Sequence, residues 1–296
     1  MHFIYANSNL SGIGDRICDI ILIFTYAKYI NCDYLYVAWR NCVNDDSIYD
    51  KMRKEKTPFR EKDIKHVLDY ILFPDDIKFI DEEMLDNLKM NNYVFDEYIG
   101  VKYSVFDFID KYLPHESDNN KNNFINSYYK NFEQLIFKNI PNYVIDTFKN
   151  KNIITIHLRR GDKVINNHGI VNDVDDVELV NLNNITQKFI DNCIEQGNNN
   201  ICFVSDEITV KNQYIEIYKN KANIINIIGN DVSQTYYDLY CMSVSKYIFL
   251  SQRFSTFSLL SAMIGKVELY FVYENSKFIE NRFDKYYNVQ KYNTLL

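Results

Sequence analysis

The second half of the chain alternates apolar strand-like runs with helical stretches, and this alternation constrains the fold more than any other feature. The apolar runs lie at 153–158, 201–205, 224–228, 247–250 and 267–272. Stretches with helical periodicity lie between them, at about 183–195, 207–219, 233–243 and 256–264. A strand, a helix and a further strand in succession favour a parallel sheet covered by helices on both faces. We therefore predict a doubly wound α/β unit here.

The first half opens in the same way, with a strand, a helix and a strand at 2–6, 15–30 and 34–39. Residues 41–66 are polar and charged and are interpreted as an insertion. Further helices are predicted at 65–73, 82–89 and 124–137, and short strands at 77–80 and 93–95. A chain of 296 residues is long enough for two domains of about 150 residues each. The predicted organisation is a first domain over 1–150, a second over 151–275, and a tail over 276–296 that packs back on the first domain.

Composition excludes several classes of protein. The net charge of −7 and the pI of about 5.3 lack the basic footprint of a nucleic-acid binder, so an anionic ligand needs a local site. None of the six cysteines has CxxC spacing, which indicates buried thiols in a reducing compartment. The most apolar stretch, 17–30, is too short to span a bilayer and carries Asp19 and Lys28. We therefore expect a cytoplasmic protein without stable membrane insertion and without nucleic acid as a partner.

The sequence HLRRGD at 157–162 is the main candidate for an anion site. It follows a β-branched strand, and open α/β sheets bind ligands at the carboxyl ends of their strands. Side chains alternate along a strand, so His157 and Arg159 are expected on one side. Arginine binds phosphate oxygens through paired, charge-assisted hydrogen bonds. The alternative is a surface ion pair between Arg160 and Asp162.

Hydroxyl-rich and glycine-rich turns supply further candidates. Ser255, Thr256 and Ser258 begin a predicted helix, whose first amides attract anions; ordinary capping by Ser255 is the alternative. Ser205 and Asp206 follow another strand, where an acid can meet a ribose or a base edge, or else cap the next helix.

In the first half, two glycines precede a helix, as expected of a ligand loop, and an arginine adds a cation there; these residues are Gly12, Gly14 and Arg16. A third glycine at dinucleotide-binding spacing is missing, so a plain turn remains the alternative.

Taken together, four segments resemble the fucosyltransferases of the α1,2, α1,6 and nodulation type. They are IITIHLRRGDKV, FVSDE, DLYCMSVSKYIFL and FSTFSLLSAM, in that order. The resemblance covers residues 150–265 well and 8–40 weakly. It implies a GT-B-like α/β fold of two Rossmann-like domains with parallel sheets, and an inverting, metal-independent transfer of fucose from GDP-fucose to a glycan hydroxyl. The partners so implied are the nucleotide-sugar donor and an oligosaccharide acceptor, and no cofactor is expected.

The resemblance also implies roles for single residues. Arg159 would hold the β-phosphate and His157 the nucleotide, while Asp238 would lie near the guanine or the helix of the second motif. The serine and threonine group would line the diphosphate pocket, namely Ser255, Thr256 and Ser258. The chain departs from the α1,2 pattern at Phe254 and at the pair 259–260, where asparagine and paired tryptophans are expected. These departures leave the acceptor and the catalytic base open.

Arg159, Arg160 and the amides at 255–256 are expected to stabilise the departing diphosphate, and Asp162, Asp173 and Asp176 are candidate bases. Two other hypotheses remain. The chain could be a metal-dependent nucleotide-sugar transferase in which Asp173 and Asp175, a DxD pattern, hold the metal, or a transferase with another donor, such as GDP-rhamnose or a UDP-sugar. The chain could also bind a glycan or nucleotide without catalysis.

Overall fold

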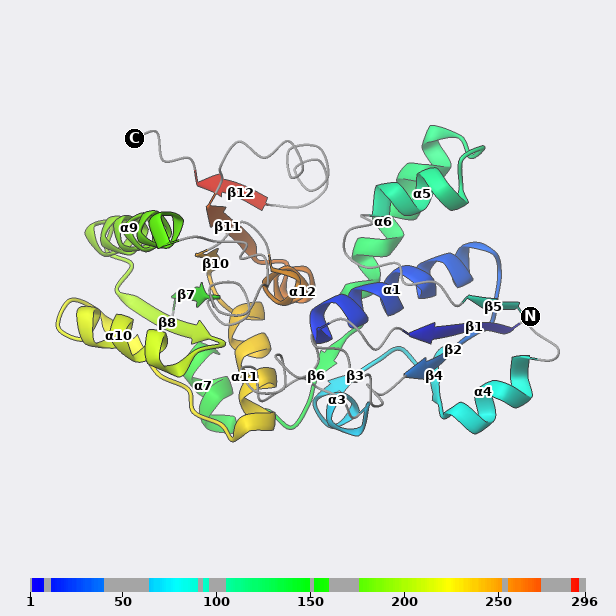
Figure 1. The fold of residues 1–296 in the computed structure, drawn as a ribbon, viewed down its shortest axis with the longest axis horizontal. Coiled ribbons are helices and arrows are strands. Elements are labelled where there is room, and N and C mark those ends of the chain that lie inside the picture. The colour runs from blue at the N-terminus through cyan, green and yellow to red at the C-terminus, as the bar shows by residue number, and fades with distance from the viewer. Residues whose placement is uncertain are drawn as a thin grey trace. The chain divides into compact units, whose positions relative to one another are not determined.

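The structure is a computed structural model that describes residues 2–7, 12–39, 64–89, 93–95, 105–149, 152–159, 176–251, 255–272 and 289–292. The described residues form two compact units, one ending at Asn139 and one beginning at Ile140 (Figure 1). The division falls before residue 150, because helix α7 (Asn142–Lys149) packs on helix α11 (Asp231–Ser243) of the second unit.

The first unit contains a parallel sheet in the order β4-β2-β1-β5. Its strands are β1 (His2–Asn7), β2 (Tyr34–Trp39), β4 (Ile77–Ile80) and β5 (Tyr93–Phe95). Its helices are α1 (Ile13–Tyr29), α3 (Ile64–Tyr70), α4 (Glu82–Lys89), α5 (Val105–Tyr112) and α6 (Asp118–Phe132). Numbered along the chain, the paired strands of this sheet run 3-2-1-4, so the direction of winding reverses between β1 and β5.

The second unit contains a parallel sheet in the order β12-β11-β10-β7-β8-β9. The strands are β7 (Ile153–Leu158), β8 (Asn200–Ser205), β9 (Asn223–Ile225), β10 (Tyr247–Leu250), β11 (Glu268–Val272) and β12 (Val289–Tyr292). Numbered along the chain, this is the 3-2-1-4-5-6 order of the doubly wound Rossmann fold. The expectation of α/β units with parallel sheets is therefore confirmed in both halves of the chain.

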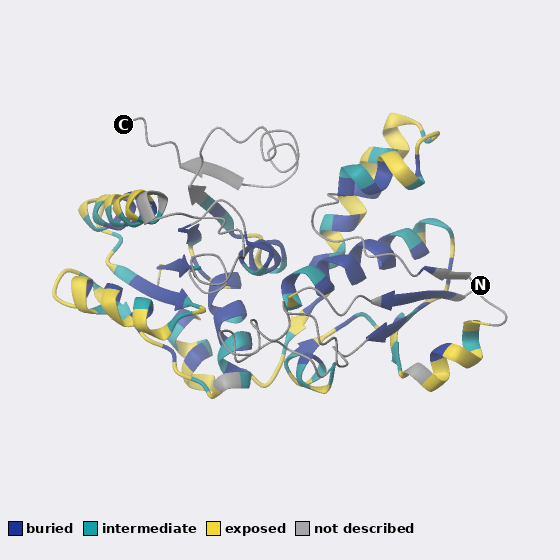
Figure 2. Cartoon of the chain, in the orientation of Figure 1, coloured by how far each residue is buried: buried dark blue, intermediate teal, exposed yellow. Residues whose placement is uncertain are grey.

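Helices cover both faces of the second sheet. Besides α7 and α11 they are α9 (Asp176–Glu195), α10 (Ile208–Tyr218) and α12 (Thr256–Gly265). Ile154, Ile156 and Leu158 alternate along β7 and pack in one core cluster with α9 and α10. Figure 2 shows buried strands of this sheet beside the more exposed helices α9 and α10, while α12 is itself largely buried. Because these three residues of β7 face the core with α9 and α10, the residues that alternate with them point to the opposite face of the sheet.

The close approach of α12 to α11 depends on a glycine. A Cβ atom on Gly265 would lie 1.7 Å from the carbonyl oxygen of Ser243. Only glycine permits backbones to meet so closely. This contact joins the last residue of α12 to the last residue of α11.

Several expectations about local structure were wrong. The helices expected at 65–73 and 124–137 end at Tyr70 and Phe132, because the residues that follow form strands β3 (Ile71–Leu72) and β6 (Ile136–Phe137). These strands pair in antiparallel fashion with each other. Helices α5 and α7 were not predicted from the sequence.

The expected course of the tail was also wrong where the structure describes it. Strand β12 pairs in parallel with β11, from Leu269 opposite Val289 to Val272 opposite Tyr292. Four residues of the tail therefore extend the second sheet. The other tail residues and the insertion expected at 41–66, up to residue 63, lie outside the described ranges.

Two further expectations concern cysteines and membranes. Cys18, Cys32, Cys193, Cys202 and Cys241 are buried and free, as expected for thiols in apolar runs. In the described parts of the chain, no helix has both the length and the apolar character needed to cross a membrane.

Candidate functional site

The reversal of strand order in the second sheet creates a candidate ligand site. β7 is flanked by β8 on one side and by β10 on the other, and the chain winds away from β7 in both directions. Ligands of open α/β sheets bind at the carboxyl ends of the strands at such a point. Residue 159 follows β7, and residues 251–255 connect β10 to α12. The sequence segments with the best anion-binding chemistry therefore meet at one edge.

His157 and Arg159 both face α12, as predicted from strand alternation. His157 Nδ1 lies 2.5 Å from the hydroxyl oxygen of Ser258. Arg159 donates from Nη1 to the hydroxyl oxygen of Ser255 at 3.0 Å. His157, in β7, and Arg159, just after it, thus contact a first-turn residue and the N-cap residue of the same helix. Arg159 is half-buried, while both serines are fully enclosed.

Ser255 occupies the N-cap position of α12 but does not cap it with its side chain. Its backbone is extended, with φ −152° and ψ 120°, and no cap hydrogen bond is made by its hydroxyl group. That hydroxyl accepts from Arg159 instead. The first amides of a helix lack partners within the helix and carry partial positive charge. Arg159 is therefore held beside the positive end of α12, which suits a dianionic ligand.

His157 is more buried than is expected of a residue whose only role is to contact a ligand. Its side chain is 4% exposed, and its ring lies 5.8 Å from the ring of Phe257, centroid to centroid. Its backbone carbonyl accepts from the amide of Ser251 at 3.0 Å, which fastens β7 to the end of β10. His157 therefore orders the edge on which Arg159 sits, and its predicted contact with the nucleotide stays a prediction.

Ser205 and Asp206 lie at the same edge, one strand away from β7. The hydroxyl group of Ser205 donates to the carbonyl of Leu158 at 2.6 Å and accepts from the amide of Glu207 at 3.1 Å. Asp206 is exposed. Helix α10 has Glu207 at its N-cap position, and that side chain makes no cap bond. Ser205 thus ties the ends of β7 and β8 together and leaves the Asp206 carboxylate outward.

Asp238 lies inside the second unit, in a polar cluster of α10 and α11. It is 8% exposed and accepts from the side-chain amide of Gln234 at 2.7 Å. Burial raises the pKa of Asp238 to about 7, and the nearby Lys211 and the Gln234 hydrogen bond oppose that rise only in part. Lys211 and Gln234 also donate to the carbonyl of Ile227, at 3.4 Å and 3.3 Å. Asp238 therefore supports the loop after β9, and its contact with a donor base stays a prediction.

The glycine loop of the first unit leads from β1 into α1, at the point where the first sheet reverses. Arg16 is 1% exposed, and its guanidinium carbon lies 3.5 Å from the ring centroid of Trp39, the last residue of β2. Gly12 has φ −71°, and an added Cβ would meet nothing closer than 4.0 Å. Gly14 is buried within the first turn of α1. The cation expected to face a ligand is thus stacked on an aromatic ring.

Trp39 is the residue that sequence reasoning missed at this edge. It is the single tryptophan of the chain and ends a predicted strand, which is a usable signal. It is 6% exposed, and the guanidinium group of Arg16 lies over its ring.

Other predicted residues lie outside the described ranges. They are Arg160, Asp162, Asp173 and Asp175, and the side chain of Asp176, the first residue of α9, is likewise not described. In the described part of the chain, no group of three or more His, Cys, Asp or Glu residues could hold a metal ion.

No family model matches the chain, and no curated protein matches it. Solved structures with similarity include the fucosyltransferase NodZ from Bradyrhizobium, at 12% identity over 88% of this chain and 90% of that chain, with a TM-score of 0.47. POFUT1 in complex with GDP is 10% identical over 91% of this chain and 98% of that chain, with a TM-score of 0.46. A variant of FUT1 from Arabidopsis thaliana in complex with GDP is 12% identical over 93% and 71%, with a TM-score of 0.45. At these identities and TM-scores the similarity carries no conclusion about the activity of this chain.

Proposed function

We propose that the chain is a glycosyltransferase that transfers fucose from GDP-fucose to a hydroxyl group of a glycan acceptor, with inversion and without a metal ion. The observation that carries the proposal is the position of Arg159. Its guanidinium is held by Ser255 at the first turn of α12, at the carboxyl edge where the second sheet reverses. A cation and a helix N-terminus together form a site for a diphosphate.

The reaction proposed for this site is a displacement at the anomeric carbon. The acceptor oxygen forms a bond to that carbon while the bond to the β-phosphate oxygen breaks, and the acceptor proton leaves to a general base. The electron pair of the broken bond stays on GDP, which gains negative charge. Arg159 and the first amides of α12 bind that charge more strongly as it develops, which lowers the barrier.

His157 and Ser205 act as positioning residues in this proposal. His157 binds Ser258 within α12 and therefore keeps the helix N-terminus against β7. Ser205 binds the carbonyl of Leu158, the residue before Arg159. Charged groups that are already fixed need no reorganisation when the leaving group forms, and this preorganisation is the larger part of such electrostatic stabilisation.

The donor within this proposal is identified by the sequence motifs. Guanine and fucose follow from the resemblance of the four segments at 153–263 to fucosyltransferases. Glycan biosynthesis in the cytoplasm is part of the same proposal, because a GDP-sugar donor and reduced thiols suit that compartment.

Donor titration and turnover test the proposal directly. The full chain is titrated calorimetrically with GDP and with UDP, and then incubated with GDP-fucose and a pool of neutral glycans while GDP release is measured. Tighter binding of GDP and glycan-dependent GDP release are expected. Tighter UDP binding would reject the donor, whereas GDP binding without hydrolysis or transfer would favour a binding protein without catalysis.

A further inference from the structure

A pocket of about 400 Å³ lies in the first unit, between helices α1 and α6. This volume is within the range of about 300–1,000 Å³ typical of small-molecule sites. Lys28 donates to the carbonyl of Asp33, just before β2, and Asp76, just before β4, accepts from it. The pocket therefore lies toward the amino ends of the strands, opposite the carboxyl edge that carries Arg16 and Trp39.

The hollow follows from the sequence of α6. Asn123, Ser127 and Asn131 recur every four residues and line the pocket, and residues at this spacing share one face of a helix. A helix face that packs fully against a neighbour carries larger apolar residues. Phe124, 2% exposed, packs deeper, and its ring meets that of Tyr29 edge-on at 5.7 Å. The short polar side chains next to these aromatic rings thus leave a space that larger apolar side chains would fill.

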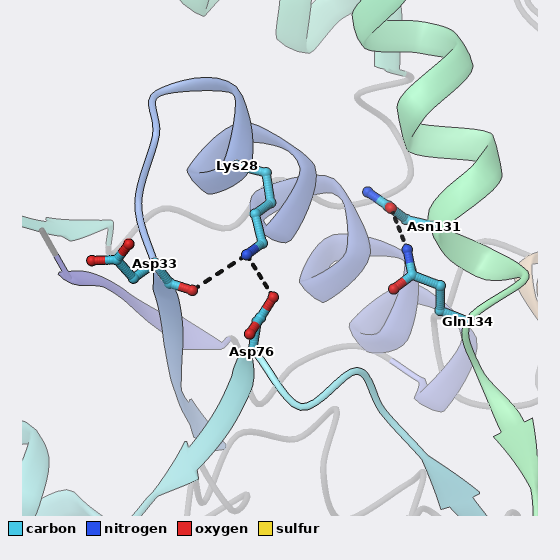
Figure 3. A network of polar contacts seen from close by, with 5 residues as sticks. All are labelled: Lys28, Asp33, Asp76, Asn131 and Gln134. Carbon is cyan, nitrogen blue, oxygen red and sulfur yellow. Dashed lines mark hydrogen bonds and ion pairs between the residues drawn. The ribbon is translucent and has the colours of Figure 1, made fainter.

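Two pairs of polar side chains are held in fixed positions around this space (Figure 3). On one side Lys28 and Asp76 form an ion pair at 2.6 Å, with side chains 40% and 45% exposed. On the other, Gln134 donates to the side-chain carbonyl of Asn131 at 2.7 Å, and Asn131 donates to the hydroxyl group of Thr25 at 2.9 Å. The side chains are therefore ordered by internal bonds before any ligand arrives.

These groups keep unused hydrogen-bonding capacity. Within the described residues, the ammonium group of Lys28 makes two bonds and retains a third hydrogen, and one oxygen of Asp76 is unused. The side-chain oxygen of Gln134 and the hydroxyl group of Ser127 likewise have no bond there. The pocket therefore offers both donors and acceptors, while the paired charges of Lys28 and Asp76 cancel.

We propose that this pocket binds a neutral saccharide, at a site separate from the proposed donor site. A sugar presents hydroxyl groups that both donate and accept, which match the amide, hydroxyl and carboxylate groups around the pocket. Its C–H faces suit the partly exposed ring of Tyr29, which lies next to the buried rings of Phe24 and Phe124. The absence of net charge between Lys28 and Asp76 disfavours a phosphate or a nucleotide. The inference does not depend on the identity of the donor.

The test uses the full chain on an array of neutral di- to tetrasaccharides with sulfated and sialylated glycans as comparison, followed by calorimetric titration of the best neutral glycan. GDP is present at saturation, so that the proposed donor site is filled. Ser127→Trp places an indole into the pocket from an exposed position of α6. Asn126→Trp adds the same side chain at a neighbouring exposed position that does not line the pocket. Gln134→Leu removes one hydrogen-bonding group at an exposed position with little change in size.

We expect wild type and Asn126→Trp to bind a neutral glycan, Ser127→Trp to bind it about tenfold more weakly or not at all, and Gln134→Leu to bind it a few-fold more weakly. Equal melting temperatures of the variants would show that folding is intact. The proposal is overturned if no neutral glycan binds, if only charged glycans bind, or if Ser127→Trp and Gln134→Leu bind as wild type does. GDP titration of the same preparations keeps the two proposals apart, because glycan binding in a chain that ignores GDP-fucose would reject only the transferase.

Discussion

Replacing Arg159 by alanine should damage turnover far more than stability. Arg159 is half-buried and donates from Nη1 to the hydroxyl oxygen of Ser255 at 3.0 Å. The variant removes the cation proposed to contact the β-phosphate but leaves the apolar face of β7 untouched, because Ile156 and Leu158 point to the opposite side.

The two effects differ in size. Loss of one donor to a developing oxyanion costs about 2.7–4 kcal/mol, or about 10²–10³ in rate. Loss of the bond to Ser255 costs about 1 kcal/mol of folding free energy, the usual net contribution of one hydrogen bond. For a unit of this size that corresponds to a fall in melting temperature of about 2–4 °C. Arg159→Lys should recover little rate, since an ammonium group lacks the planar fork that binds two phosphate oxygens.

The assay compares GDP release from GDP-fucose with melting temperature for wild type, Arg159→Ala and Arg159→Lys. Lys246→Ala is the matched control. It removes an exposed cation and one side-chain bond, to Asn198 at 2.7 Å, just before β10 and therefore at the opposite edge of the same sheet. The control should keep normal turnover. Near-normal turnover in Arg159→Ala, or a rate loss that follows the loss of folded protein, would refute the assignment of the diphosphate to this edge.

The remaining predictions concern the donor, the metal and Asp238. GDP should bind more tightly than UDP in calorimetry, and a reversed order would reject the guanine assignment. Turnover of GDP-fucose should survive EDTA, because Arg159 and the α12 amides are proposed to neutralise the diphosphate; a loss with EDTA that manganese restores would point to Asp173 and Asp175. Asp238→Ala should weaken GDP binding in calorimetry. Its cost in folding should also be measurable by melting, since Lys211 would lose its buried carboxylate neighbour. The pKa of Asp238 is about 7 in the folded chain and about 3.9 in an unfolded one, so the native state binds the proton more tightly. Its contribution to stability is complete below about pH 4 and is lost as the pH rises through about 7. Asp238→Asn should remove that loss, so its melting temperature should rise relative to wild type between pH 5 and pH 8; parallel curves would contradict the buried carboxylate.

The sequence predicted the second unit well because its strands are buried on both faces. Such strands are continuous β-branched and aromatic runs, and β7 and β10 begin and end where the pattern placed them. Strand parity then placed His157 and Arg159 on one side, which their contacts with Ser258 and Ser255 confirm. The pairing of β7 with β10 joins strands that are far apart in the sequence. The only general reason to expect a site there is that ligands of open α/β sheets bind where the strand order reverses.

The failures have physical causes as well. Ile71–Leu72 and Ile136–Phe137 continue apolar patterns that fit a helix, but their pairing across a long stretch of sequence draws them into a two-stranded sheet. The spacing of apolar residues within a short segment does not reveal that a distant segment will pair with it. Arg16 was expected to meet a ligand because it follows two glycines, and this contact stays a prediction, but its position over the ring of Trp39 was not expected. A cation beside a glycine loop does not reveal which aromatic ring will cover it.

Two hydrogen bonds at this edge join the end of β7 to the start of α12, through Ser255 and Ser258. His157 and Arg159 are two residues apart on a strand, a rise of about 6.6 Å, and their serine partners are three residues apart at the start of a helix. Both spacings return a side chain to the same face, so the two bonds fix the helix against the strand in one register. If Arg159 loses Ser255, the bond from His157 to Ser258 still holds α12 in place. If His157 loses Ser258, the helix N-terminus can shift and carry Ser255 away from Arg159. Ser258→Ala should therefore remove the bond from His157 and also weaken the hold of Ser255 on the Arg159 guanidinium beside the helix amides. In a double-mutant cycle of GDP binding, the effects of Ser255→Ala and Ser258→Ala should then be less than additive.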